Sequence, residues 1–146
     1  MTNVKETKQA ADHLLEVLNE RILGYKKAAE KVDDTSLKTI FKDYSKQAED
    51  FADELLPFSD KQEWSESETS ATGDMWRVWM DLKSVLTGGS NDAMVKASIK
   101  GEKDAIKNFD NVLKDNTNLD PELRGIVSKQ VSLMKTACER LEKLKS

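Results

Sequence analysis

Apolar residues recur at alternating steps of three and four along most of the chain, a pattern typical of helices with one buried face. The first such stretch covers about residues 3–32, and its apolar face is Leu15, Leu18, Ile22, Tyr25, Ala29 and Val32. Residues 33–36 are polar and offer several helix-capping side chains for a second stretch. That second face is Leu37, Phe41, Tyr44, Ala48, Phe51, Leu55 and Phe58. Pro57 should kink or end this helix, and the short connection predicts an antiparallel hairpin.

A second pair of helices is predicted in the C-terminal half. The third helix should begin at Ser90, Asn91 or Asp92, directly after a Gly-Gly pair, and end near residue 115. Its inward face is Val95, Ile99, Glu102, Ile106, Phe109 and Leu113. Asp120 followed by Pro121 signals the start of the fourth helix, which should reach about residue 144. Its inward face is Leu123, Val127, Gln130 or Val131, Met134, Cys138 and Leu141, so these helices should form a second hairpin.

The connection between the hairpins, residues 59–89, is too long for a tight turn. Residues 61–73 are polar and predict a loop, whereas residues 74–86 have a helical pattern that a Gly-Gly pair ends. One side of this extra helix carries Met75, Trp76, Trp79, Leu82 and Leu86. The chain is therefore expected to be all-α: a ferritin-like four-helix bundle, in which a long crossover containing a short extra helix joins two antiparallel hairpins.

Length and charge narrow the class of protein further. A chain of 146 residues is expected to form one domain, residues 1–146, around a single core. Its net charge of −4 argues against general binding of nucleic acid or of anionic membranes. Its N-terminal residues lack the apolar core of a signal peptide, and no run of about 18 apolar residues could span a bilayer. The single cysteine, Cys138, cannot form an internal disulfide, so we expect a cytoplasmic protein.

The ligands of a di-iron centre are missing. Bundles that hold such a centre supply inward glutamates and Glu-x-x-His pairs from facing helices. Here the one histidine is His13, and the residue three positions before it is Ala10. We therefore expect no cofactor, no metal centre and no catalytic residue.

Glu102 is the strongest candidate for a site residue. It lies between Ile99 and Ile106 on an apolar face, so it should point into the bundle. A buried carboxylate has to be paired, hydrogen-bonded or protonated. Counting back from the predicted turn places it level with about Met134. The polar groups expected near it, as a polar core layer, are Tyr25, Tyr44, Gln130 and Arg21.

Two interpretations of Glu102 stay open. It could be part of a variant metal site or contact a small ligand. It could instead belong to a structural polar layer that fixes the register of the helices, which we favour. If it only sets register, Glu102→Leu should be tolerated.

The other candidate residues have simpler explanations. Cys138 lies on an apolar face with no group nearby to lower its pKa, so it should be a small buried hydrophobe rather than a nucleophile. His13 should be a lone residue at the surface edge. Trp76 and Trp79 could form an aromatic wall of a ligand site, or an interaction patch that mediates self-association through the crossover. We favour packing of the crossover against the bundle.

The chain resembles a known family over nearly its whole length. The most specific match is residues 79–89, Trp-Met-Asp-Leu-Lys-Ser-Val-Leu-Thr-Gly-Gly. Further matches are Gly24-Tyr25, Ala28-Ala29-Glu30, Gly101-Glu102 and the Pro-Glu-Leu-Arg that opens the fourth helix. In these residues the chain is similar to an uncharacterised bacterial family of four-helix-bundle proteins, a domain of unknown function in the ferritin-like superfamily.

The resemblance implies a fold rather than an activity, because one fold supports many functions. Family members carry a histidine where this chain has Cys138 and tend to carry an acidic residue where it has Ile22; Glu102 matches. We therefore expect a non-enzymatic binding or interaction protein, related to stress by analogy. The alternative is a metal-dependent oxidoreductase or metal-binding protein with an atypical site around Glu102.

Overall fold

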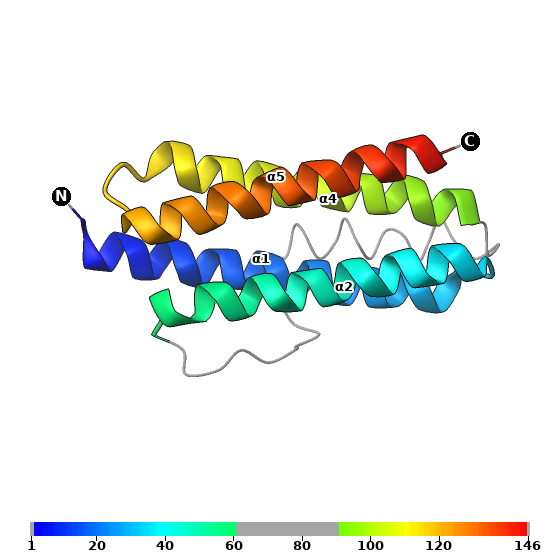
Figure 1. The fold of residues 1–146 in the computed structure, drawn as a ribbon, viewed down its shortest axis with the longest axis horizontal. Coiled ribbons are helices and arrows are strands. Elements are labelled where there is room, and N and C mark those ends of the chain that lie inside the picture. Colours follow the sequence, from blue (N-terminus) through cyan, green and yellow to red (C-terminus); the bar gives the residue numbers. More distant parts are fainter. Residues whose placement is uncertain (1, 61–90, 146) are drawn as a thin grey trace.

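The computed structural model describes residues 2–60 and 91–145, and all of their regular structure is helical (Figure 1). These residues form four α-helices: α1 (Val4–Lys31), α2 (Thr35–Leu55), α4 (Asn91–Asp115) and α5 (Pro121–Leu144). A short 3₁₀ helix, η1 (Leu56–Phe58), follows α2 and contains Pro57. The prediction of an all-α protein is confirmed, and the observed helix ends lie within about two residues of the predicted ones.

Side-chain caps explain where three of the helices begin. Asn3 accepts a hydrogen bond from the backbone N–H of Glu6 at 3.0 Å, and Asp34 accepts one from Leu37 at 2.9 Å. Asp120 accepts from the N–H groups of the second and third residues of α5, at 2.8 and 3.3 Å. These bonds satisfy backbone donors that have no partner within the helix.

Each described helix of the bundle packs against two others. α1 packs against α2 and α4, α5 packs against α4, and α2 also contacts α5. Contacts along α1 and α4 pair low residue numbers with high ones: the N–H of Asn3 donates to the carbonyl of Asn118, and the N–H of Asp33 donates to Asn91 Oδ1. α1 is therefore antiparallel to α4, as it is to α2, and α2 and α4 run in the same direction (Figure 1).

The two described ends of the connection between α2 and α4 lie at opposite ends of the bundle. Asp60 forms an ion pair with Lys8 at 2.8 Å, near the start of α1. Asn91 instead meets Asp33, just after the end of α1. The loop predicted over residues 61–73, the extra helix predicted over residues 74–86 and the patch of Trp76 and Trp79 lie outside the described residues.

The predicted inward faces form the core. Most of their members are buried, and the half-buried ones are Leu37, Tyr44, Phe58, Ile106 and Leu113. α1 buries a wider face than its pattern predicted, including Ala11, Leu14 and Val17, none of which exposes any surface. A helix with packed neighbours on more than one side has no single apolar stripe, so the pattern underestimated its burial.

Candidate functional site

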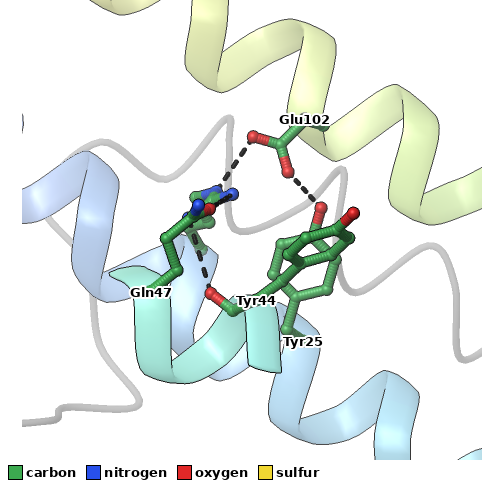
Figure 2. Close-up of polar contacts among 5 residues, drawn as sticks. Tyr25, Tyr44, Gln47 and Glu102 are labelled. Carbon is green, nitrogen blue, oxygen red and sulfur yellow. Dashed lines mark hydrogen bonds and ion pairs between the residues drawn. The ribbon is translucent and has the colours of Figure 1, made fainter. Parts of the chain in front are cut away.

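Three fully buried polar side chains meet between α1 and α4 (Figure 2). Arg21 and Tyr25 lie four residues apart on α1, so they lie on the same face of that helix. Glu102 comes from α4, and the relative exposure of all three residues is 0%. α2 adds Tyr44 and Gln47 at the edge of this group. We refer to these five residues as the Glu102 cluster.

Each carboxylate oxygen of Glu102 has a donor. Arg21 Nε donates to Oε1 at 2.9 Å, and the hydroxyl of Tyr25 donates to Oε2. Hydrogen bonds in which both groups are charged are stronger than neutral ones, particularly away from water. α1 therefore supplies both groups that compensate the carboxylate, one of them a full positive charge.

The guanidinium of Arg21 is also enclosed. Its Nη2 donates to Gln47 Oε1 at 2.8 Å, and its Nη1 lies 3.5 Å from the backbone carbonyl of Tyr44. Its central carbon lies 5.2 Å from the ring centroid of Tyr25 and 5.6 Å from that of Phe51, within the range of cation–π attraction. The cation thus has acceptors on two helices and aromatic rings beside it.

The environment fixes two protonation states. Burial alone would lower the pKa of Arg21, but the charge of Glu102 and further interactions outweigh it and raise that pKa. Burial raises the pKa of Tyr25 well above its ordinary value of 10.0, and the negative charge of Glu102 raises it further. At neutral pH the cluster therefore contains a cationic Arg21 and a neutral, donating Tyr25.

The two tyrosines of the predicted polar layer have different roles. The ring of Tyr44 packs on that of Tyr25 at a centroid distance of 5.4 Å, and Phe41 stacks on Tyr25 at 5.9 Å. Tyr44 contributes its backbone carbonyl to the hydrogen bonding of the cluster, whereas Tyr25 contributes its hydroxyl. Gln47 was not anticipated, because it lies beside the apolar face of α2 and only its bond to Arg21 gives it a role.

Gln130 is not brought to Glu102. Its Nε2 instead donates to the backbone carbonyl of Phe51 and to Glu54 Oε1, both at 3.2 Å, between α5 and α2. That Glu102 lies level with about Met134 stays a prediction. Lys103, next to Glu102, forms an ion pair with Glu142 on α5 at 3.1 Å, and the charge of Glu102 acts on Cys138, one helical turn after Met134.

Cys138 and His13 lie at the margins of this arrangement. Burial raises the pKa of the Cys138 thiol, and the charge of Glu102 raises it further, so the thiol is a poor nucleophile. His13 Nε2 lies 3.2 Å from Asn108 Oδ1, in a half-buried contact between α1 and α4. Within residues 2–60 and 91–145, no three His, Cys, Asp or Glu side chains are grouped so that they could hold a metal ion.

Ser98 Oγ, one helical turn before Glu102, and Gln130 Oε1 are buried and have no hydrogen-bond partner among the described residues. Each lies on a different helix and neither contacts the carboxylate of Glu102 through a hydrogen bond. Both oxygens of the Glu102 carboxylate thus have donors within the cluster, and its hydrogen bonds join α1 to α2 and to α4.

Comparison with known proteins identifies a family. Residues 6–115 match the family described as Domain of unknown function (DUF2383), and the chain belongs to that family. The match ends where α4 ends. Searches of curated proteins and of solved structures gave no match. In the described parts of the chain, no helix is both long and apolar enough to cross a membrane.

Proposed function

We propose that this protein is a non-enzymatic binding or interaction module whose bundle core contains an internal ion pair in place of a di-iron centre. The observation that supports this most directly is the position of Arg21. Its guanidinium lies 2.9 Å from the carboxylate that a metal site would need. A role in stress remains an analogy with ferritin-like relatives.

The chemistry of Glu102 argues against its use as a metal ligand. A divalent cation bound there would have to displace the Tyr25 hydroxyl and approach a fixed positive charge. Removing one partner of a buried ion pair leaves the other charge uncompensated, at a typical cost of about 3–5 kcal/mol. Inner positions of α1 and α2 where ligands would be required carry Ile22, Ala48 and Phe51, which have no ligating atoms.

The same proposal includes a ferritin-like arrangement of a single domain spanning residues 1–146. It is supported by the common direction of α2 and α4 and by the positions of Asp60 and Asn91 at opposite ends of the bundle. Helices that run in the same direction require a long connection, as in ferritin-like bundles. A bacterial source and a cytoplasmic location are also proposals, which rest on the resemblance and the composition.

Three observations favour the alternative, a metal-dependent protein with an atypical site around Glu102. Glu102 is fully buried, the Cys138 thiol lies near enough to feel its charge, and Ser98 Oγ is buried without a described partner. Buried titratable groups are enriched at functional sites, although structural ion pairs also produce them.

Metal loading distinguishes the two functions. The purified protein would be incubated anaerobically with Fe²⁺ or Mn²⁺ and desalted, and the retained metal per chain would be measured. We expect no stoichiometric retention by the wild type. Retention of two metal ions per chain would overturn the proposal if Glu102→Ala abolished it and Glu139→Ala, which removes an exposed carboxylate on α5, did not.

A further inference from the structure

The outward face of α4 carries a row of lysines. Between residues 96 and 109 every largely exposed position of α4 is a lysine: Lys96, Lys100, Lys103 and Lys107. Their steps of four, three and four keep the side chains within about 60° of arc and spread them over about 16 Å of helix. We call these four residues the lysine row. Asp110 continues the same line and ends the row.

The ammonium groups of the lysine row are available to a partner. Lys96 pairs with Asp92 at 3.0 Å and Lys103 with Glu142 at 3.1 Å, and the two lysine side chains are 57% and 62% exposed. Exposed pairs of this kind contribute little and are screened by salt, so they exchange readily for a stronger partner. Lys100 and Lys107 form no ion pair with any residue in the described ranges.

A comparison with α2 shows how the row differs from a helix face of mixed charge. Along the outward face of α2, Lys42 and Lys46 are followed by Asp50 and Asp53, and Lys46 pairs with Asp50 at 3.0 Å. Like charges three or four residues apart on a helix repel each other and destabilise it. The lysine row contains three such neighbouring pairs, which suggests that the charges serve an external anion.

We propose that the lysine row binds a flexible linear polyphosphate chain, which lies along α4. A single file of cations spaced one helical turn apart complements a linear polyanion, and lysine binds phosphate as a point charge. The proposal rests on the binding role proposed above and names the partner for it.

The features around the row select this partner over other anions. Single-stranded nucleic acid is held by stacking on aromatic rings. The large apolar side chains that the described residues expose are Val4, Leu133 and Leu144, none of them aromatic. A membrane surface would need apolar side chains that insert beside the lysines, and none of the large apolar side chains exposed in the described ranges lies on α4. A rigid duplex would bring a larger part of the surface of this protein, whose net charge is −4, against its phosphates.

Binding of end-labelled inorganic polyphosphate, followed by fluorescence anisotropy, tests this. The row variant replaces the lysine row with glutamine. A charge-matched control replaces four exposed lysines elsewhere: Lys5, Lys42, Lys46 and Lys129. Thermal unfolding followed by circular dichroism would verify that both variants are folded. We expect the logarithm of wild-type affinity to fall with the logarithm of salt concentration with a slope of about −3, for four neutralised phosphates.

The row variant should lose affinity on the order of 10²- to 10³-fold at low salt, from about fivefold for each lysine beside an anionic surface. The control should stay within about threefold of wild type by the same reasoning. An equal loss in both variants, or no wild-type binding at low salt, would overturn the proposal. Tighter binding of single-stranded DNA, duplex DNA or anionic vesicles would also overturn it. Metal retention is measured separately, so failure here leaves the test of the proposed function intact.

Discussion

Two interfaces, α1–α4 and α2–α5, join the helical hairpins, and they differ in the kind of polar group that they bury. Along the α1–α4 interface, polar contacts occur from end to end: Asn3 with Asn118, His13 with Asn108, Arg21 and Tyr25 with Glu102, and Asp33 with Asn91. At the α2–α5 interface, the buried polar contact of the described residues is made by the Gln130 side chain. One interface buries charges and the other buries a neutral amide.

The two interfaces differ in whether every polar atom of the buried side chain has a hydrogen-bond partner. Every polar atom of the Glu102 carboxylate has a donor, whereas Gln130 Oε1 has no partner among the described residues. An uncompensated buried charge is far more costly than an unsatisfied amide oxygen. Substitutions of the buried polar residues should therefore lower the free energy of unfolding more at the α1–α4 interface than at the α2–α5 interface.

The largest expected effect comes from breaking the ion pair on one side only. Arg21→Met leaves Glu102 without its cation, and Glu102→Leu leaves Arg21 without its anion. Each single substitution should lower the free energy of unfolding by about 3–5 kcal/mol. The midpoint and slope of urea unfolding, followed by circular dichroism, measure this.

The double variant Arg21→Met/Glu102→Leu sharpens that prediction. Removing both charges leaves no uncompensated ion, so it should be more stable than the sum of the single effects implies, by about 2 kcal/mol or more. Additive losses would contradict a direct pairing of the two side chains. The buried Arg21 also changes what the sequence suggested about Glu102→Leu, which we no longer expect to be tolerated.

An intermediate effect is expected for Tyr25→Phe. The substitution keeps the ring and removes the hydroxyl that donates to Glu102, so the loss should be about 1.5–3 kcal/mol, typical of a hydrogen bond to a charged group. Tyr44→Phe is the matched control, because Tyr44 joins the cluster through its backbone carbonyl. A loss in Tyr44→Phe as large as that in Tyr25→Phe would contradict the assigned roles.

The difference in stability between the wild type and Tyr25→Phe should depend on pH. The pKa of Tyr25 is raised above its unfolded value of 10.0, so its contribution is fully present below about pH 10 and is lost as the pH rises through the folded value. The stability difference between wild type and Tyr25→Phe should therefore shrink above pH 10. Urea unfolding at a series of alkaline pH values measures it, and a difference that widened would show the opposite shift.

The smallest effect is expected at the other interface. Gln130→Leu removes an amide whose oxygen has no described partner and replaces it with an apolar side chain of similar size. The substitution also removes the hydrogen bonds of the amide to the Phe51 carbonyl and to the exposed Glu54. This loss and the gain from removing the unpaired oxygen should nearly cancel, so the free energy of unfolding should change by less than about 1 kcal/mol in either direction. A loss of unfolding free energy as large as that of Arg21→Met would show that the α2–α5 interface depends on its buried polar residue as much as the α1–α4 interface does.

The sequence pattern predicted the helices well because local rules set them. The capping carboxylates of Asp34 and Asp120 and the alternating apolar spacing need no knowledge of the rest of the chain. The inward position of Glu102 also followed, because it interrupts an apolar face. Its partners were only partly predictable: four polar groups were expected near it, and Gln130 instead lies with Phe51 and Glu54.

The sequence by itself determined the helices, their inward faces and the presence of a carboxylate in the core, because these depend on residues within a few turns of one another. Only the tertiary structure decided which groups meet Glu102. The approach of Arg21 to Glu102, 81 residues apart in sequence, depends on how α1 packs against α4, and no local pattern encodes that distance.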